Sequence, residues 1–262
     1  MTGVAKNTVA KLLVELGAAC SEYQDRAMRS LHCDRVQVDE IWSFVYCKQK
    51  TANKLQKEAE AAGEPESLDA IGDVWTWVAM DADTKLVPCC YVGQRTKECA
   101  RDFMLDLASR ISNRAQLTSD VLSSYAGAVF NAFGGYVDYA QVHKVFGKDD
   151  SSKQAHTRYS PAVCTGCYKE KILGAPELSK STTSHVERQN LTMRMSMRRF
   201  TRLTNAFSKK VENHAAAISL HFMWYNFGRK HQALKATPAM AAGITNHVWS
   251  VEEVVGLLDE SN

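Results

Sequence analysis

One apolar run constrains the fold of this chain more than any other feature. Residues 74–80 read V-W-T-W-V-A-M, and all but one of them are apolar. Such a run is typical of a strand that is buried on both faces, as in sheets that helices cover. The run therefore predicts a strand in the interior of a layered structure.

The order of the other segments indicates the fold class. Turn residues 81–85 and a returning run at 86–92 predict a hairpin, and Pro88 puts the returning strand at a sheet edge or makes it irregular. Residues 147–183 are polar, contain Pro and Gly, and are interpreted as a long connection. We predict an α/β fold with a mixed sheet of about five strands flanked by helices. The further strands are expected at 35–46, 116–120 and 136–146, and helices at 104–111, 125–133, from about 184, and 208–226.

Two segments lie outside this pattern. Val9, Leu12, Leu13 and Leu16 have the spacing of one buried helix face, and Gly17 is the expected end of that helix. Residues 48–72 are charged and form an excursion between the first two strands, with a helix expected over 53–62.

Composition bounds the class of protein. Of the 262 residues, 45% are apolar and 23% are charged, with a net charge of +3, which is typical of a globular chain. The eight cysteines are expected to be reduced thiols, because a chain of this length needs no disulfides. No uncharged stretch is apolar enough to span a bilayer, so we expect a cytoplasmic protein without membrane contact.

Three acids occupy positions where a sheet could bring them together. Asp39 interrupts an apolar strand, Asp120 closes a second strand, and Glu187 begins a helix. A buried carboxylate is costly unless it is paired or bound to a cation, and oxygen ligands suit Mg²⁺. The alternative is structural, because acids are common in strands and at helix starts, and Asp81, Asp83 and Asp138 are competing candidates.

A basic stretch follows the third acid. Between residues 188 and 211 there is no acid, which favours contact with phosphates, although a solvated helix face explains the pattern equally well. Its cations are Arg188, Arg194, Arg198, Arg199, Arg202, Lys209 and Lys210.

Cys164 and Cys167 form a single CxxC pair, with His156 and His185 as the nearest histidines. One pair without a second is a weak indication of zinc, so we expect two loop thiols and no zinc.

These motifs resemble those of a known family. Residues 38–45 and 117–125 are similar to the first-acid and second-acid motifs of bacterial insertion-sequence transposases of the IS-one type. Residues 184–195, S-H-V-E-R-Q-N-L-T-M-R-M, closely resemble the third-acid helix of that family. Residues 225–238 are similar to the Y-N-x-x-R-x-H-x-x-L-x-x-T-P tail shared with many integrases. The resemblance runs over nearly the whole chain.

The resemblance implies a DDE transposase with a ribonuclease H-like core at residues 34–235 and a C-terminal tail at 236–262. Such enzymes cleave DNA strands at transposon ends and join the freed 3′-hydroxyl to target DNA. It implies that Asp39, Asp120 and Glu187 hold Mg²⁺ or Mn²⁺ and that Arg194 contacts a phosphate near the scissile bond. Double-stranded DNA is the expected partner, bound by a homo-oligomer. Further DNA contacts are expected from the basic stretch and from Asn226, Arg229, His231, Lys6, Asn7 and Lys11.

The chain departs from the family at its start. Relatives begin with a zinc-binding segment and a full helix-turn-helix, whereas residues 1–32 resemble only the turn and second helix. We therefore expect an N-terminally truncated copy with a helix-turn-helix remnant. Two alternatives stay open at this point: a non-catalytic DNA-binding fragment that acts as a regulator or an inactive remnant, and a ribonuclease H-like nuclease without strand transfer.

Overall fold

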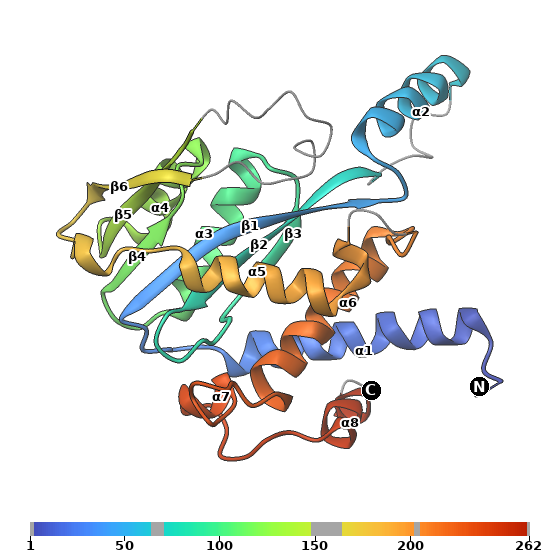
Figure 1. Cartoon of the computed structure of the whole chain (residues 1–262). Coiled ribbons are helices and arrows are strands. Elements are labelled where there is room, and N and C mark those ends of the chain that lie inside the picture. The colour runs from blue at the N-terminus through green and yellow to red at the C-terminus, as the bar shows by residue number, and fades with distance from the viewer. Residues whose placement is uncertain (1–2, 64–70, 148–163, 202–204, 261–262) are drawn as a thin grey trace.

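The protein is built around one mixed sheet (Figure 1), and the computed structural model describes residues 3–63, 71–147, 164–201 and 205–260. Six strands lie in the order β3-β2-β1-β4-β5-β6. Strands β1, β2 and β3 form an antiparallel meander, β4 and β5 pair in parallel, and β6 returns antiparallel to β5. The strands are β1 (Arg35–Val45), β2 (Gly72–Asp81), β3 (Cys90–Gly93), β4 (Ala115–Ser119), β5 (Val137–Phe146) and β6 (Cys164–Leu173).

The α/β class with a mixed sheet is confirmed, but the sheet has a sixth strand. Strand β6 lies in the segment that the sequence indicated as a long connection, so that interpretation was wrong for residues 164–173. Its side chains are almost all exposed, and its backbone pairing with β5 makes it a strand. The expected edge position of the Pro88 segment agrees with the structure, since β3 begins only at Cys90 and lies at the sheet edge.

Helices cover both faces of the sheet (Figure 1). Helices α3 and α4 pack on one face and α5 crosses the other, while α1, α6, α7 and α8 gather beyond the β2–β3 hairpin. No helix in the described ranges is both long and apolar enough to cross a membrane. The helices are α1 (Lys6–Ala27), α2 (Gln49–Ala62), α3 (Lys97–Arg110), α4 (Ser123–Phe133), α5 (Ser184–Ser196), α6 (Val211–Met223), α7 (Pro238–Ala241) and α8 (Val251–Glu260).

Strand β1 divides two apolar clusters. Successive side chains of a strand point to opposite faces. Val36 and Val38 therefore join the cluster formed with α3 and α4, whereas Ile41 joins Val186 of α5 and Phe222 of α6. Asp39 has the parity of Ile41, so the strand directs it towards α5.

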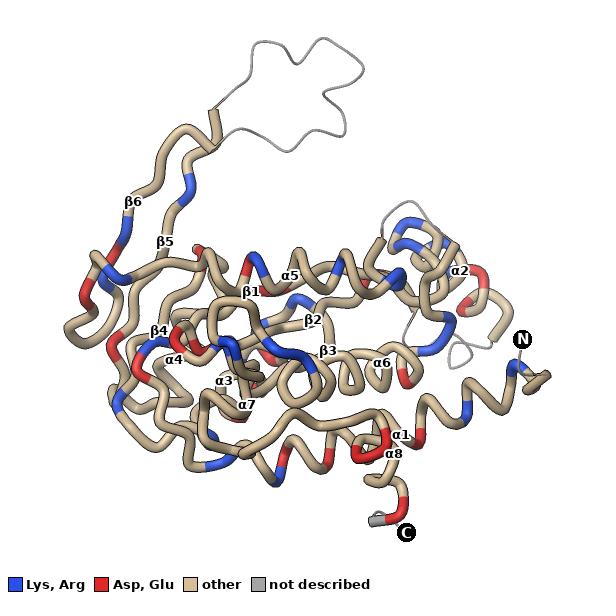
Figure 2. The backbone as a smooth tube through the Cα atoms, turned by 60° about the horizontal axis from the view of Figure 1, so that its bottom comes forward, with Lys and Arg blue, Asp and Glu red and all other residues tan. Residues whose placement is uncertain are grey.

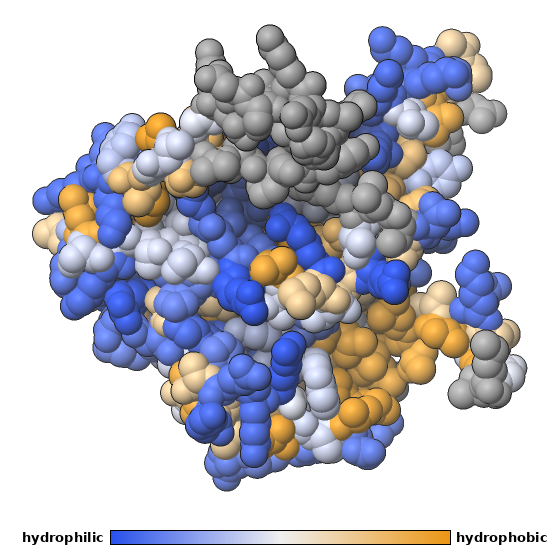
Figure 3. Space-filling view, in the orientation of Figure 1, coloured by the Kyte–Doolittle hydropathy of each residue, from blue (hydrophilic) through white to orange (hydrophobic). Residues whose placement is uncertain are grey.

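Helix α1 does not end at Gly17, contrary to the prediction. Gly17 is buried within the helix, and a Cβ built on it would lie 2.5 Å from Cα and Cβ of Ala216 in α6. The glycine therefore lets two helices approach closely rather than ending one. The predicted buried stripe is also incomplete, because Val9 is 55% and Leu12 is 48% exposed. Figure 3 shows an apolar area where α1 passes beside α6.

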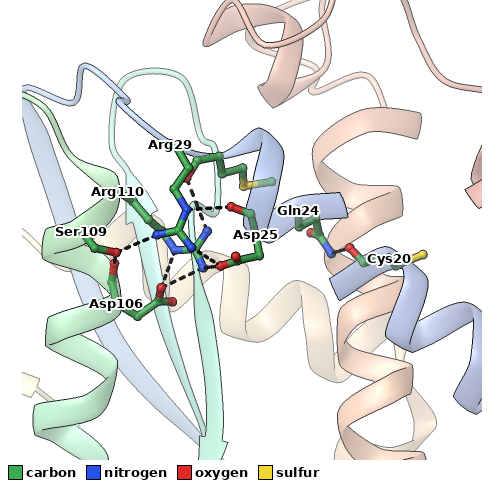
Figure 4. A network of polar contacts seen from close by, with 8 residues as sticks. Cys20, Gln24, Asp25, Arg29, Asp106, Ser109 and Arg110 are labelled. Atoms are coloured by element: carbon green, nitrogen blue, oxygen red, sulfur yellow. Dashed lines mark hydrogen bonds and ion pairs between the residues drawn. The ribbon is translucent and has the colours of Figure 1, made fainter. Parts of the chain in front are cut away.

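A network of ion pairs ties α1 to α3 (Figure 4). The Arg110 guanidinium, whose side chain is only 7% exposed, lies 2.6 Å from Asp25 Oδ1 and 2.8 Å from Asp106 Oδ1. Arg29 also pairs with Asp25 and donates to Ser109 Oγ at 2.8 Å. We call these two acids and two arginines the α1–α3 network. The hydrogen bond that Arg29 donates to Asp25 and the positive charge of the nearby Arg110 lower the pKa of Asp25.

Candidate metal centre

Parallel pairing brings the first two predicted acids together. The register of β1 and β4 pairs Arg35 with Gln116 and Gln37 with Thr118. Asp39 lies two residues beyond Gln37 and still within β1, and Asp120 lies two residues beyond Thr118 as the first residue after β4. The same end of the sheet therefore carries both carboxylates, which is where parallel strands commonly present functional groups.

A third carboxylate that sequence reasoning missed joins them. Oxygen atoms of Asp39, Glu40 and Asp120 lie within 4.8 Å of one another, and this is the one such acidic group among the described residues. The sequence does place Glu40 directly after Asp39. Neighbouring side chains of a strand point to opposite faces, however, so Glu40 was not expected to lie beside the other two acids. Both side chains still reach Asp120, because β1 extends past the end of β4.

Glu40 has its own counterion. It is buried, its Oε1 accepts from Arg95 Nε at 2.9 Å, and its Oε2 accepts from the Tyr125 hydroxyl at 2.9 Å. Burial nevertheless raises the pKa of Glu40, as does the Asp120 charge, and the Arg95 guanidinium opposes that rise. The positive charge of Arg95 thus balances one of the three carboxylates and leaves the aspartates short of cations.

The two aspartates favour protonation or a bound cation. Burial, followed by the charges of Glu40 and Asp120, raises the pKa of Asp39 to about 7. Burial likewise raises the pKa of Asp120, although the backbone N–H of Leu122 donates to its Oδ1 at 3.2 Å. Asn190 of α5 donates from Nδ2 to Asp39 Oδ2 at 2.8 Å and fixes that carboxylate. Oxygen ligands held this closely have the chemistry of an Mg²⁺ or Mn²⁺ site.

Glu187 lines the same cleft but stands at its edge. The cleft, of about 770 Å³, is lined by Asp39, Asp120 and Glu187, and the Glu187 charge contributes to the raised pKa of both aspartates. Its own carboxylate, however, accepts from Lys144 Nζ and Thr183 Oγ1 and lies outside the close group of three. We call this space, with Asp39, Glu40, Asp120 and Glu187, the acidic cleft. Shared coordination by all three predicted acids stays a prediction.

Helix α5 is held in place at its first turn. The backbone N–H groups of His185 and Val186 donate to Gln37 Oε1 at 2.9 Å and 3.2 Å. These are among the helix N–H groups that have no partner within the helix. Gln37, two residues before Asp39 and on the same face of β1, thereby fixes the position of Glu187 relative to Asp39.

The predicted basic DNA contacts are spread over several elements. Arg188 and Arg194 are exposed on α5, along which Lys and Arg positions appear in Figure 2. Arg199 is half-buried and donates to Ser208 Oγ at 2.7 Å, and Arg202 lies outside the described residues. The remaining cations and Asn7 are exposed: Arg198 after α5, Lys209 and Lys210 before α6, Arg229 after it, and Lys6, Asn7 and Lys11 on α1. Their contact with DNA stays a prediction.

Asn226 does not fit its predicted role. It is fully buried, its Oδ1 accepts from the backbone N–H of Val87 at 3.0 Å, and its Nδ2 donates to the Val87 carbonyl at 3.0 Å. Its amide thus bonds a backbone unit next to Pro88, where β3 has not yet begun. An interior side chain with these partners has no surface for DNA, so the structure assigns Asn226 to positioning the hairpin.

Cys164 and Cys167 lie on β6, not in a loop as expected, and both thiols are free and exposed. The Cys164 Sγ contacts the Gly166 carbonyl oxygen at 3.3 Å.

A match to a known protein family covers the part of the chain that contributes α5 to this site. Residues 164–228 match the family model described as IS1 transposase. This match supports an IS1-type transposase. The matched segment runs from β6 through α5 and α6, so it includes Glu187 but neither Asp39 nor Asp120, and it covers less than half of the chain. No curated protein matches the chain. The transposase family points in general to DNA binding and DNA cleavage.

Proposed function

We propose that this chain is a DDE transposase that cleaves DNA strands with divalent metal ions and joins the freed 3′-hydroxyl to target DNA. The observation that carries the proposal is the group of Asp39, Glu40 and Asp120 in a cleft that Glu187 also lines. The family match at Glu187 supports the same reaction class independently of the group of three.

The strand arrangement supports a ribonuclease H-like core. A three-stranded antiparallel meander continues through β1 into two parallel strands, with helices on both faces. The resemblance implies one position for each acid. Asp39 lies on the central strand β1, Asp120 follows the parallel strand β4, and Glu187 lies on the covering helix α5.

The carboxylates of Asp39 and Asp120 would hold Mg²⁺ or Mn²⁺, with Glu187 completing the site. Such ions, when bound, lower the pKa of an attacking water or hydroxyl and stabilise charge on the leaving oxygen in phosphoryl displacement. Asn190 orients the Asp39 carboxylate, and Arg95 neutralises Glu40 so that it adds little net charge. Lys144, beside Glu187, would attract a DNA phosphate into the acidic cleft.

The expected partner is double-stranded DNA, bound in the cytoplasm by an oligomer, because transposition requires two ends to be held together. The exposed first half of α1 supports further DNA contact through Lys6, Asn7 and Lys11. Val9 and Leu12 on the same half are exposed apolar positions against which a further helix of a helix-turn-helix would pack.

The test is strand cleavage of a duplex that carries the sequences flanking the reading frame, with Mg²⁺ or Mn²⁺ added. We expect nicked product from the parent chain and joined product when a 3′-hydroxyl end and a target plasmid are supplied. Nicking without joining would favour a nuclease. DNA binding that survives alanine at Asp39, Asp120 and Glu187, with no cleavage by the parent chain, would favour the non-catalytic alternative.

A further inference from the structure

His143 of β5 lines the acidic cleft together with the predicted acids, and it is the one histidine among the described residues of that lining. The parallel pairing of β4 and β5 ends where Ser119 lies opposite Gln141, whereas β5 continues to Phe146. Beyond that last pair, the cleft borders on the overhanging end of β5. The spacing of paired strands puts the Cα atoms of His143 and Asp120 within about 10 Å of each other.

The side chain of His143 lies on the face of the sheet that α4 covers. Side chains alternate along a strand, so His143 shares a face with Tyr139. Tyr139 belongs to the apolar cluster formed with α3 and α4, and its hydroxyl lies 2.7 Å from Ser119 Oγ. Residues 120–123 run from the end of β4 into α4 and also line the cleft. The imidazole of His143 therefore borders on the same space as the connection that carries Asp120.

Two side chains of β6 hold the imidazole ring. Tyr168 lies directly opposite His143 in the β5–β6 pairing, and the two rings stack with centroids 4.2 Å apart and an interplanar angle of 15°. Glu170 lies two residues further along β6, and its Oε2 is 2.8 Å from His143 Nε2. A carboxylate accepts hydrogen bonds, so Nε2 carries the hydrogen. Nδ1 is then the nitrogen that gains or loses a proton.

The other ionisable side chains of the cleft are already engaged. The two aspartates that would hold metal ions carry no proton to give once a cation is bound. Arg95 and Lys144, the two cations, are paired with acids. Histidine changes its charge between pH 5 and 8, so it can release a proton near neutral pH. In the described lining, His143 is therefore the side chain best suited to supply one.

We propose that His143 is a further catalytic residue, which gives the proton on Nδ1 to the 3′-oxygen that leaves during strand cleavage. The proposal rests on the proposed function for the reaction. The oxygen of the attacking water bonds to phosphorus while the bond from phosphorus to the 3′-oxygen breaks. The electron pair of that bond stays on the 3′-oxygen and takes the proton from Nδ1. One proton of the water is released and returns to Nδ1 through solvent. Glu170 is a positioning residue, because its carboxylate orients the ring and offsets the imidazolium charge.

The experiment uses the full chain, Mn²⁺ and two duplexes that differ in one atom at the scissile phosphate. One duplex has the natural 3′-oxygen, and the other has a bridging 3′-sulfur, which leaves as a thiolate and needs no proton. His143→Gln is compared with His247→Gln. His247 also pairs with a glutamate, Glu253, and stacks on Trp249, but its side chain is 51% exposed and does not line the cleft. Calorimetry measures the Mn²⁺ affinity of each variant.

We expect His143→Gln to nick the oxygen duplex about a hundredfold or more slowly than the parent chain, as for the loss of a general acid. It should nick the sulfur duplex at nearly the parental rate and bind Mn²⁺ with parental affinity. Glu170→Gln should show the same pattern with a smaller loss, and His247→Gln should match the parent throughout. An equal loss on both duplexes, or no loss on the oxygen duplex, would overturn the proposal.

Failure of the proposed function gives a different result. If the parent chain nicks neither duplex, the proposed function is wrong and the role of His143 falls with it. If the parent chain nicks both and His143→Gln does so at the same rates, only the role of His143 is wrong. Nitrogen NMR of the metal-free parent chain adds a readout that needs no cleavage. We expect the hydrogen of the neutral His143 ring on Nε2, and a hydrogen on Nδ1 would contradict the assigned proton donor.

Discussion

The acidic cleft and the α1–α3 network are both half-buried groups of charged side chains, yet they are balanced differently. In the α1–α3 network Asp25 and Asp106 meet Arg29 and Arg110, so each acid has a cation. In the acidic cleft four acids face two cations of the described residues, Arg95 and Lys144.

The pKa shifts report this difference. Neighbouring arginines lower the pKa of Asp25, whereas burial and neighbouring acids raise the pKa of Asp39 to about 7. A balanced cluster of this kind holds two helices together. An unbalanced one is costly to fold without a ligand, and residues that accept such a cost often serve function.

The largest expected effect is on catalysis. Asp120→Asn keeps the shape of the side chain but removes one charged ligand, and metal ions contribute several kcal/mol to phosphoryl transfer. We expect strand nicking to fall about a thousandfold or more. Asp102→Asn, on the exposed side of α3, is the matched control and keeps full activity. Nicking by Asp120→Asn at the parent rate would remove this residue from the site.

The second effect is on stability and lies in the balanced cluster. Arg110→Met leaves Asp25 and Asp106 with only Arg29 between them, and breaking a buried ion pair costs about 3–5 kcal/mol. Urea unfolding should show that loss, while Arg101→Met, which breaks an exposed pair with Asp102, costs less than about 1 kcal/mol. Equal losses in the two variants would mean that the network contributes no more than a surface ion pair.

The third effect is a gain in stability rather than a loss. Because the pKa of Asp39 is raised in the folded chain, its contribution to stability is favourable in acid and is lost as pH rises through about 7. Without divalent metal, Asp39→Asn should therefore raise the free energy of unfolding by about 2 kcal/mol at pH 8. The gain should shrink below pH 7 and nearly vanish by about pH 4.

Thermal unfolding with and without Mg²⁺ completes that test, since added metal should stabilise the parent chain at pH 8 but not Asp39→Asn. The exposed Asp34→Asn serves as control. A loss of stability in Asp39→Asn at pH 8 would contradict an uncompensated charge at this position.

The smallest effect concerns Lys144, whose ammonium competes for the Glu187 carboxylate. Lys144→Met frees Glu187, and an exposed ion pair is worth less than about 1 kcal/mol, so Mn²⁺ should bind up to about fivefold more tightly by calorimetry. Lys171→Met on β6 should leave the affinity unchanged. Weaker binding in Lys144→Met would mean that Glu187 takes no part in holding the ion.

Periodicity predicted the elements that bury apolar side chains, and it failed where other forces decide. Strand β6 is exposed and polar, so its pairing with β5 left no hydrophobic pattern. Gly17 has the residue type of a helix end, but its contact with Ala216 depends on a helix that lies far along the chain.

The site was predicted in the same uneven way. The positions of Asp39 and Asp120 follow from strand order, whereas the approach of Glu40 depends on where β4 stops. Asn226 belongs to a motif that resembles DNA-contacting tails, and motif spacing carries no information about its burial.

The hydrogen bonds between Asn226 and Val87 also bear on how the molecule behaves in concentrated solution. Open sheet edges invite strands of other molecules, and the resulting contacts lead to aggregation. Here a side-chain amide occupies the N–H and carbonyl of Val87, and Pro88 offers no N–H beside them. At Val87 a foreign strand would find both backbone groups already bonded.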